Sequence, residues 1–414
     1  MESTKQRGLF AWWHGTPLYW RILGGLVLGL VIGLIFGPAS GALALPSKLI
    51  LRLLGALAPA LILFAIVQAL MTAQFEKGTA GRIIRLLLLN TLVAICIGLL
   101  VANVIQPGSR SPAMQPQAEN EGRPLEKKDM LAQFLDNVPK SLLGPLADDG
   151  KVIGVIFIAV AIGIALRKFP TRPIHNVKDV VDLGLEVLIT ILHWIIDLVP
   201  FAVCGLVASI IGTKGFAPFY ALVFFIIAVL VALLLQAGYY LTRIYFGSWV
   251  RPLDLLRGGR DALVMGFSTA SSTVTMPVTF ECLRNKVGLR EKSASLGALV
   301  GSNFNNDGTA LYEAMAALFI SQLLVAQGLG IDLTLTQQLM VVATSVIASV
   351  GAAGIPEAGL VTMTLVFSAV GLPIEYIAFL LPVDWFLDRC RTSINIMGDM
   401  NVSCMLDGKT REIT

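Results

Sequence analysis

The chain has 414 residues and a mean hydropathy of +0.77; 56% of its residues are hydrophobic and only 14% are charged. A soluble domain carries about 25% charged residues, so the composition excludes an ordinary soluble fold. The formal net charge is +4, and no basic cluster is interleaved with aromatic residues, which argues against a nucleic-acid partner. The three histidines are scattered and the five cysteines form no CxxC pair, which argues against a histidine or thiol metal site.

Apolar stretches long enough to cross a bilayer recur through the first part of the chain. A spanning helix needs about 20 mainly apolar residues. Five stretches of this kind lie at Leu18–Phe36, Leu51–Leu70, Ile83–Ile105, Val181–Ile211 and Ala217–Tyr240. The first is followed by too many others to be a cleaved signal peptide, so we expect it to be a retained helix.

Lysine and arginine are concentrated in alternate connections between these stretches. The basic groups are Lys5 with Arg7; Lys77 with Arg82 and Arg85; Arg167, Lys168, Arg172 and Lys178; and Arg243, Arg251, Arg257 and Arg260. Because cytoplasmic loops collect positive charge, this pattern predicts a multi-pass cell-membrane protein with six spans before Arg251 and both termini in the cytoplasm. The connection Ser109–Asp129 mixes both charge signs and is expected to be external.

The segment Ser268–Phe280 is predicted to be a re-entrant hairpin. Basic residues return at Arg284, about two dozen residues after Arg260, which is too soon for two spanning helices. The segment is rich in small and hydroxyl residues and is interrupted by Pro277, as expected of a hairpin that is buried in protein. We expect it to enter from the cytoplasm.

The rest of the sequence repeats this plan from the other side. We predict a long helix from Ala294 to about Ala326, a second hairpin over Val341–Leu372 broken at Gly351, Gly354 and Pro356, and a final helix from Pro373 to about Met405. Such an inverted repeat places a binding site near the membrane midplane; two unrelated glycine-rich kinks are the alternative. The predicted fold is an all-α membrane protein with eight transmembrane helices and two re-entrant helical hairpins.

The final helix carries a row of polar residues. Asp384, Asp388, Arg391 or Thr392, Asn395 and Asp399 recur at steps of three and four, so they share one helical face. An ionised side chain at mid-membrane costs about 2.5 to 3.5 kcal/mol and indicates a functional site. Arg391 suits a carboxylate and Asp388 suits an ammonium, which together match an acidic amino acid. The alternative is an ion-pair ladder that only holds helices together.

The preceding helix contains a polar run from Asn303 to Gly308 that breaks an ordinary lipid-facing helix. Oxygen atoms of Asn305, Asp307, Asn395 and Asp399 are the hard ligands that small cations prefer, which predicts a sodium site. Hydrogen-bonded packing between helices is the alternative.

Glu313 lies six residues beyond Asp307 on the same predicted helix. Burial would disfavour its charged form, which suits a proton carrier. The alternative is a glutamate that reaches the surface or pairs with a loop arginine.

Three motifs resemble those of one transporter family. The stretches NNDGTALYEA (Asn305–Ala314), GAAGIPEAG (Gly351–Gly359) and DWFLDRCRTSINIMGD (Asp384–Asp399) are similar to those of the dicarboxylate/amino acid:cation symporters, which include excitatory amino acid transporters and archaeal aspartate transporters. The resemblance covers nearly the whole chain. It implies a glutamate-transporter-like fold and a homotrimer in the lipid membrane, in which each transport domain moves substrate by an elevator-like shift.

The resemblance also implies a division of the chain. Residues 1–150 would contain mainly trimerisation scaffold helices 1–3 and the external loop, with helix 3 joining the transport domain. Residues 151–250 would contain helices 4–6, and residues 251–414 would form the core transport domain from the first hairpin to helix 8.

Individual site residues follow from the same resemblance. Arg391 would hold the side-chain carboxylate of the substrate, Asp388 its amino group, and Asn395 with Thr273 its α-carboxylate. The other residues of the substrate site would be Ser272, Thr309, Thr392, Ile355, Pro356 and Gly359. The sodium ligands would be Gly301, Asn305, Asp307, Asn395 and Asp399, with Asn90 and Thr91 nearby. Glu313 matches a glutamate that is used for proton coupling.

Three positions depart from the family pattern. Asn306 stands where the family has a methionine, Leu87 replaces the tyrosine of the third helix's sodium site, and Glu357 replaces a small residue or glutamine. The first two leave the number of sodium ions open, and the charge of Glu357 would weaken selectivity for anions. The expected activity is import of glutamate or aspartate coupled to Na⁺, H⁺ or both.

Other functions remain as alternatives. A C4-dicarboxylate or neutral amino acid symporter of the same fold would differ in substrate, and with a C4-dicarboxylate Asp388 would face no ammonium. An anion-conducting channel would carry current without accumulating substrate. An intramembrane hydrolase using Ser271 or Ser272 would need a base, and no histidine or lysine lies beside them in the sequence. We therefore expect no enzyme.

Overall fold

The computed structural model describes residues 16–72, 80–110, 173–326, 332–351 and 358–410, together with residues 144, 158, 161–166, 169 and 328. All regular secondary structure in these ranges is helical, as predicted. Most of the predicted external loop Ser109–Asp129 and much of residues 151–172, at the start of the region expected to hold helices 4–6, lie outside the described ranges. The basic residues Lys5, Arg7, Lys77, Arg167, Lys168 and Arg172 also lie outside them.

The five apolar stretches of the first part of the chain form helices near their predicted bounds. These helices are α2 (Leu18–Phe36), α3 (Leu45–Thr72), α4 (Ala80–Ile105), α8 (Val177–Asp197), α9 (Val199–Lys214) and α10 (Ala217–Gly247). Short 3₁₀ turns follow α2 and α4, η1 (Gly37–Ala44) and η2 (Pro107–Arg110). The stretch predicted as one helix over Val181–Ile211 is two, because Pro200 lies in the first turn of α9, where a proline is tolerated.

Helices α2 and α9 pack closely along a seam of glycines. A Cβ atom at Gly33 would lie 2.7 Å from the carbonyl oxygen of Ala208 on α9, and one at Gly25 or Gly29 would collide with the α9 backbone a turn or two earlier. Small residues at four-residue spacing let helix backbones approach in a membrane, where packing replaces the hydrophobic drive between helices. The seam fixes α2 against α9.

A helical hairpin forms where the sequence predicts the first one. Its arms are α11 (Pro252–Thr269) and α12 (Ser272–Glu281), and they contact each other. The chain turns at Ala270, which has φ 51°, and Ser271 caps α12 by accepting a hydrogen bond from the Val274 backbone amide at 3.2 Å. The predicted interruption at Pro277 is wrong, because Pro277 lies inside α12 and the cap at Ser271 sets the turn earlier.

The predicted helix Ala294–Ala326 is broken at the polar run. Its first part comprises α13 (Glu291–Ser295), η4 (Leu296–Val300) and α14 (Gly301–Phe304), which follow the wide turn η3 (Cys282–Val287). Asn305 leaves the helical conformation at φ −107° and ψ 64°, and α15 (Asp307–Ala326) starts the second part. The break leaves Asn305 and Asn306 as buried, non-helical residues at the centre of the fold.

The last elements are α16 (Leu335–Gly351), α17 (Ala358–Ala369), the 3₁₀ turn η5 (Ile374–Leu380) and α18 (Leu381–Asp407). Helices α16 and α17 contact each other, as the arms of the predicted second hairpin would. The tip that joins them, with Gly354, Ile355, Pro356 and Glu357, lies outside the described ranges.

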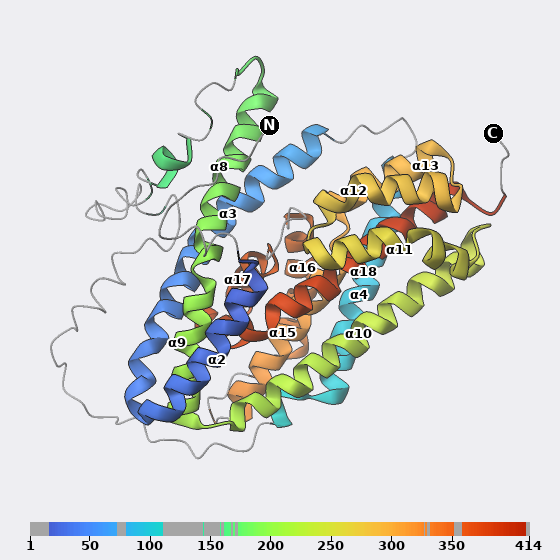
Figure 1. Cartoon of the computed structure of the whole chain (residues 1–414). Coiled ribbons are helices and arrows are strands. Elements are labelled where there is room, and N and C mark those ends of the chain that lie inside the picture. Colours follow the sequence, from blue (N-terminus) through green and yellow to red (C-terminus); the bar gives the residue numbers. More distant parts are fainter. Residues whose placement is uncertain are drawn as a thin grey trace.

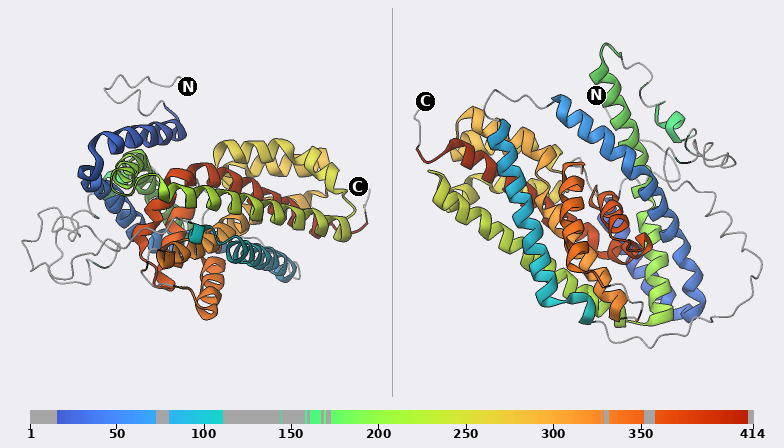
Figure 2. Two further views of the ribbon diagram at one scale, coloured as in Figure 1. Left: turned by 90° about the horizontal axis from the view of Figure 1, so that it is seen from below. Right: turned by 180° about the vertical axis from the view of Figure 1, so that it is seen from behind.

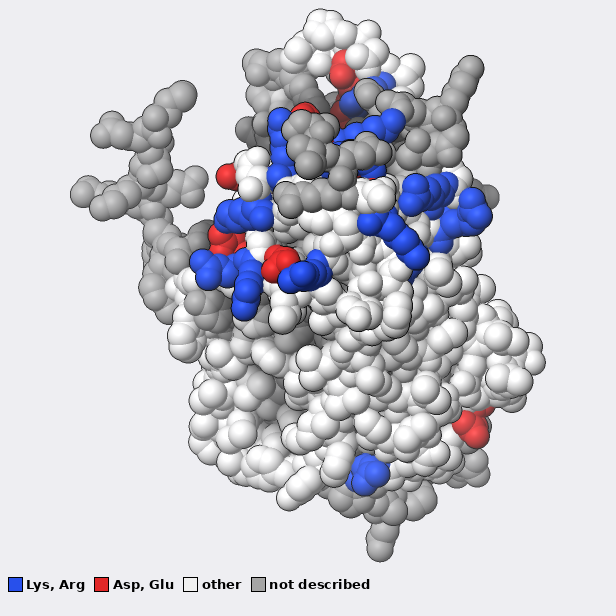
Figure 3. Space-filling model, turned by 90° about the vertical axis from the view of Figure 1, so that its right-hand side faces the viewer, with Lys and Arg blue, Asp and Glu red and all other residues white. Residues whose placement is uncertain are grey.

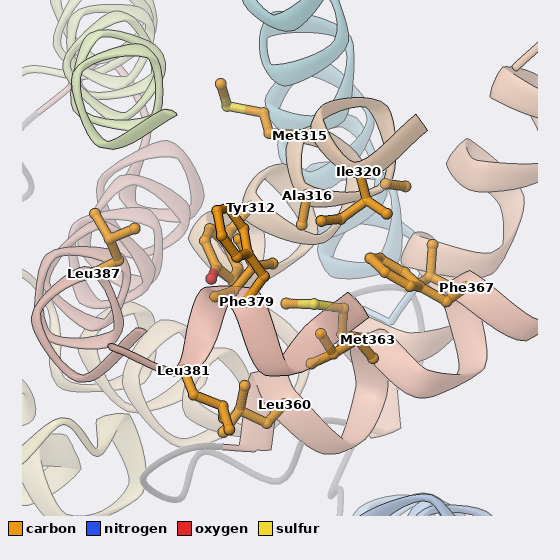
Figure 4. Packing of buried hydrophobic residues seen from close by; sticks show 14 of the residues in the cluster. Tyr312, Met315, Ala316, Ile320, Leu360, Met363, Phe367, Phe379, Leu381 and Leu387 are labelled. Carbon is orange, nitrogen blue, oxygen red and sulfur yellow. The ribbon is translucent and has the colours of Figure 1, made fainter. Parts of the chain in front are cut away.

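The elements form two groups on either side of α15 to α17 (Figures 1 and 2). Helices α2, α3, α8 and α9 lie on one side, and α4, α10 to α13 and much of α18 lie on the other. Apart from polar residues such as Asp307, Thr309 and Glu313 near its start, helix α15 is mainly apolar, and it is almost wholly buried, as expected of a central helix. Figure 4 shows its Tyr312 beside Phe379 of η5 and its Ile320 near Phe367 of α17, while Met315 points away from them.

The surface fits a lipid environment. By length and apolarity, five stretches of the described chain could cross a membrane: Trp20–Leu61, Gly81–Arg110, Val177–Thr213, Phe219–Gly247 and Glu291–Ala326. Large apolar side chains such as Ile35 and Leu234 are each 71% exposed. On the face seen in Figure 3, lysine and arginine gather toward one end above a broad surface with few charges. This is the pattern expected of a protein that spans a bilayer.

Candidate functional site

The polar row predicted on the final helix lies on a buried face of α18. Asp384, Asp388, Arg391, Thr392, Asn395 and Asp399 are each at most 6% exposed. Helix α18 packs against α10, α11 and α15, so this face is enclosed by protein. Arg389, which the spacing places off the row, is half-buried; its Nη1 donates to the carbonyl of Trp385 at 2.9 Å.

Arg391 forms ion pairs with two carboxylates of its own helix. Its Nη1 lies 2.8 Å from Asp384 Oδ1 and its Nη2 lies 2.8 Å from Asp388 Oδ1. The Tyr312 ring of α15 lies against the guanidinium, whose carbon is 3.9 Å from the ring centroid, a cation–π contact. The third donor, Nε, is buried and has no hydrogen-bond partner in the described part of the chain. Asp388, which the sequence assigned to an ammonium, therefore holds the arginine in this structure.

The start of α17 reaches the same guanidinium. A Cβ atom at Gly359 would lie 3.3 Å from Arg391 Nη2, so the backbone of α17 packs closely against the guanidinium. The first residues of α17, which would follow the tip of the predicted second hairpin, thus lie beside Arg391. The structure brings together Gly359, Thr309 and Arg391, whose place in one site was predicted.

Asn395 links α18 to the start of α15. Its Oδ1 accepts from the Gly308 backbone amide at 2.7 Å, and its Nδ2 lies 3.4 Å from both Asn306 Oδ1 and Thr309 Oγ1. Asn306 Nδ2 in turn donates to the Ser349 carbonyl of α16 at 2.8 Å. The amide that replaces the family's methionine therefore joins the second hairpin to the polar row.

The first hairpin approaches the broken helix but not the guanidinium. Ser272 Oγ donates to the Ser302 carbonyl at 3.2 Å, and Thr273 is exposed one residue later. The hydroxyl of Ser271 is the cap of α12. These contacts hold the serines in structural roles and give no sign of the hydrolase alternative.

The residues predicted to bind a cation lie around the break between α14 and α15. Asp307 is fully buried: its Oδ1 accepts from Thr91 Oγ1 of α4 at 2.6 Å, and its Oδ2 accepts from the Tyr240 hydroxyl of α10. Asn305 Nδ2 lies 3.2 Å from both the Asn395 carbonyl and Asp399 Oδ1. Asn305 Oδ1 is buried without a hydrogen-bond partner among the described residues.

Gly301 makes room for the second carboxylate of this region. A Cβ atom there would collide with Asp399 Oδ1 and lie 2.7 Å from its Cγ. The described residues contain no group of three His, Cys, Asp or Glu side chains placed to hold a metal. A cation here would be held by single carboxylates with amide and hydroxyl oxygens, and the unpartnered Asn305 oxygen fits that role.

Asn90 and Leu87 of α4 contribute differently from Thr91. Asn90 Oδ1 accepts a hydrogen bond from Arg243 Nη1, and the Asn90 carbonyl accepts one from Gln236 Nε2 at 3.4 Å. The side-chain oxygen of Asn90 is therefore already bound by the guanidinium of Arg243. Leu87 lies in an apolar cluster with Val300 and Val402.

Tyr240 is a site residue that the sequence reading missed. It ends a long apolar stretch, where a tyrosine is ordinary at a membrane interface. The available signal was spacing: Gln236, Tyr240 and Arg243 recur at steps of four and three, so a polar face continues along α10.

Glu313 lies six residues beyond Asp307 on α15 and is fully buried. Its Oε1 accepts a hydrogen bond from Thr362 Oγ1 of α17, and its Oε2 has no hydrogen-bond partner in the described ranges. Glu313 thus contacts α17, the second arm of the predicted second hairpin, which also carries Gly359.

Comparison with known proteins agrees with this arrangement. The family model described as the sodium:dicarboxylate symporter family matches residues 18–409. Excitatory amino acid transporter 2 from Mus musculus is 38% identical over 256 residues, which are 61% of this chain and 44% of that protein. An excitatory amino acid transporter from Caenorhabditis elegans is 29% identical over 406 residues, 86% of this chain and 79% of that protein. The chain therefore matches less than half of the mouse protein's length.

Proposed function

Because the chain belongs to the sodium:dicarboxylate symporter family, we propose that it imports acidic amino acids, glutamate or aspartate, by cation symport. Relatives named excitatory amino acid transporters support this substrate class. The observation that carries the proposal is Arg391: a guanidinium fully buried on α18, held by two carboxylates, with the start of α17 beside it.

The proposed binding step is an exchange of ion pairs. The side-chain carboxylate of the substrate takes the place of Asp388 on Arg391, and the released Asp388 binds the substrate's ammonium. Such an exchange keeps every buried charge paired, which is what makes charged groups tolerable inside a membrane. Asn395, with Thr309 and Thr392, holds the α-carboxylate end, and the first hairpin closes over it with Ser272 and Thr273.

The proposed coupling ions bind on the other side of Asn395. Sodium occupies oxygen sites formed by Asn305, Asp307 and Asp399, with Gly301 and Thr91, while Glu313 carries a proton. Asn395 belongs to both sites, since its side chain reaches Gly308 and its carbonyl reaches Asn305. Sodium binding and substrate binding are thereby coupled through one residue.

The finer architecture is also a proposal. Eight spanning helices and two re-entrant hairpins form a homotrimer with cytoplasmic termini in the cell membrane. Residues 251–414 form the moving transport domain, joined by helix 3 (α4), and most of residues 1–150 with parts of 151–250 form the scaffold. The separation of α2, α3, α8 and α9 from α10 and α18 supports this division (Figure 1).

Uptake into proteoliposomes tests the proposal. Radiolabelled aspartate should accumulate under an inward sodium gradient, and succinate and serine as competitors report whether a C4-dicarboxylate or a neutral amino acid is preferred. Arg391→Ala should abolish acidic uptake, whereas Arg389→Ala, which removes a neighbouring arginine outside the row, should retain it. Undiminished aspartate uptake by Arg391→Ala would refute the substrate assignment, and currents without accumulation would indicate a channel.

A further inference from the structure

Tyr240 reaches the candidate cation site from α10, a helix to which the sequence assigned no site residue. Its side chain is fully buried, and its hydroxyl donates to Asp307 Oδ2. Thr91 of α4 donates to the other oxygen of the same carboxylate at 2.6 Å. Each oxygen of Asp307 therefore receives one hydroxyl, and the two hydroxyls come from different helices.

The Tyr240 hydroxyl also lies beside the other cation-site residues. A Cβ atom at Gly398 of α18 would be 2.8 Å from the Tyr240 oxygen and in collision with Asn305 Nδ2. The glycine thus marks a point where α10, α18 and the break before α15 meet. The Asn305 side chain in this place carries a buried oxygen, Oδ1, that no donor among the described residues satisfies.

The tyrosine is held in position from its backbone as well. Asn401 Nδ2 of α18 donates to the Tyr240 carbonyl at 3.1 Å. On the same face of α10, Gln236 and Arg243 both bind Asn90 of α4. A polar face on a spanning helix is costly unless it is used, and this one points three polar side chains toward α4 and Asp307.

We propose that Tyr240 is a ligand of the cation that Asp307 binds, and that its phenol oxygen completes a shell with Thr91 and Asn305. A hydroxyl that donates its hydrogen to a carboxylate keeps lone pairs for a cation, and small alkali cations prefer such oxygens. Leu87, one turn before Thr91, packs in an apolar cluster and offers only its carbonyl, whose oxygen lies 3.1 Å from Thr91 Oγ1.

This inference rests on the proposed sodium coupling, and sodium-dependent stability of the purified full-length protein tests the two separately. The unfolding temperature is measured while NaCl replaces choline chloride at constant ionic strength. Wild type should become more stable with sodium, and Tyr240→Phe should need about tenfold more sodium for half of that effect. Tyr239→Phe, which removes the neighbouring hydroxyl, should leave the midpoint unchanged.

Each outcome has one meaning. If sodium did not raise the unfolding temperature of the wild type, the proposed sodium coupling would be refuted. A Tyr240→Phe protein that is less stable at every salt composition, with the wild-type sodium midpoint, would show a purely structural tyrosine and overturn the inference.

If Tyr240→Phe does not fold, a probe that keeps the hydroxyl group still tests the inference. With 3-fluorotyrosine incorporated at position 240 alone, the ¹⁹F resonance should move on sodium addition with the midpoint seen in the unfolding series. A resonance unmoved by sodium, in protein that sodium stabilises, would equally overturn the inference.

Discussion

Arg391 and Asp384 lie seven residues apart on α18, and their side chains are joined by a 2.8 Å ion pair between Nη1 and Oδ1. Asp388 holds the other terminal nitrogen at the same distance. One guanidinium therefore binds two carboxylates of one helix, and either could give way to a substrate carboxylate. The start of α17 at Gly359 lies beside Nη2, the nitrogen that Asp388 holds, which favours Asp388 as the residue that is released.

Asp388→Asn should weaken aspartate binding ten- to a hundredfold, because a hydrogen bond between charged groups contributes about 1.5 to 3 kcal/mol. Succinate, which has no ammonium, should be affected much less. The comparison variant is Asp384→Asn, which removes the other ion pair of Arg391 and should change both ligands alike. Competition against radiolabelled aspartate measures both affinities, and an equal loss of aspartate and succinate in Asp388→Asn would contradict the ammonium role.

Glu313→Gln should make uptake independent of an imposed proton gradient while leaving sodium-driven uptake in place. The glutamine keeps an acceptor for the Thr362 hydroxyl and cannot exchange a proton, so the contact with α17 survives. In wild type, a more acidic outside should speed uptake, since the carboxyl must load a proton there. Initial rates across external pH measure this, with Glu281→Gln, an exposed acid, as control. A pH profile unchanged in Glu313→Gln would exclude it as the proton carrier.

Gly301→Ala should raise the half-saturating sodium concentration at least tenfold. Its new Cβ atom would collide with the Asp399 carboxylate and displace it from Asn305. Gly238→Ala is the matched control: its Cβ atom meets nothing within 4 Å, so only the modest helix preference of alanine remains. Sodium-dependent unfolding of both variants checks the prediction, and the two glycines behaving alike would contradict it.

Asn306→Leu should lower the unfolding temperature by several degrees, because the Ser349 carbonyl of α16 would lose a 2.8 Å hydrogen bond inside the protein. An unsatisfied buried polar group costs about 1 to 3 kcal/mol. Asn303→Leu removes an exposed amide whose partner among the described residues is the Leu299 carbonyl of the preceding turn, and this should cost less. Equal losses in thermal unfolding would show that Asn306 does not fasten the second hairpin.

The sequence predicted the helices well wherever a helix is apolar along its length, because such a helix appears in the sequence as a long apolar run. It also predicted the break at Asn305, because consecutive amides and a carboxylate cannot face lipid. The turn at Ala270 was missed because Pro277 is the more visible signal, whereas the chain turns before Ser271, whose side chain caps α12, and Pro277 lies inside that helix.

The candidate site was predicted only in part. Residues that share one helix, from Asp384 to Asp399, follow from spacing alone. Tyr240 and the attachment of Asn90 to Arg243 depend on how α10 packs against α4, which no single-helix pattern contains. The three-residue spacing of Asp388 and Arg391 allows an ion pair between them. The spacing alone does not show whether Asp388 binds Arg391 or the substrate's ammonium.

The placement of Arg391 and both of its acids on α18 has an electrical consequence. Moving a single charge through a potential of 100 mV changes its free energy by about 2.3 kcal/mol. If the acids stood on a helix that did not move with Arg391, the movement would also separate the ion pairs and leave unpaired charges inside the membrane. Here one positive and two negative groups travel as a unit whenever α18 moves. In the proposed transport step the voltage therefore acts on these three groups as a formal sum of one negative charge. The rest of the voltage dependence would come from the other charges on the moving helices, such as Asp399, and from the ions and substrate that bind there.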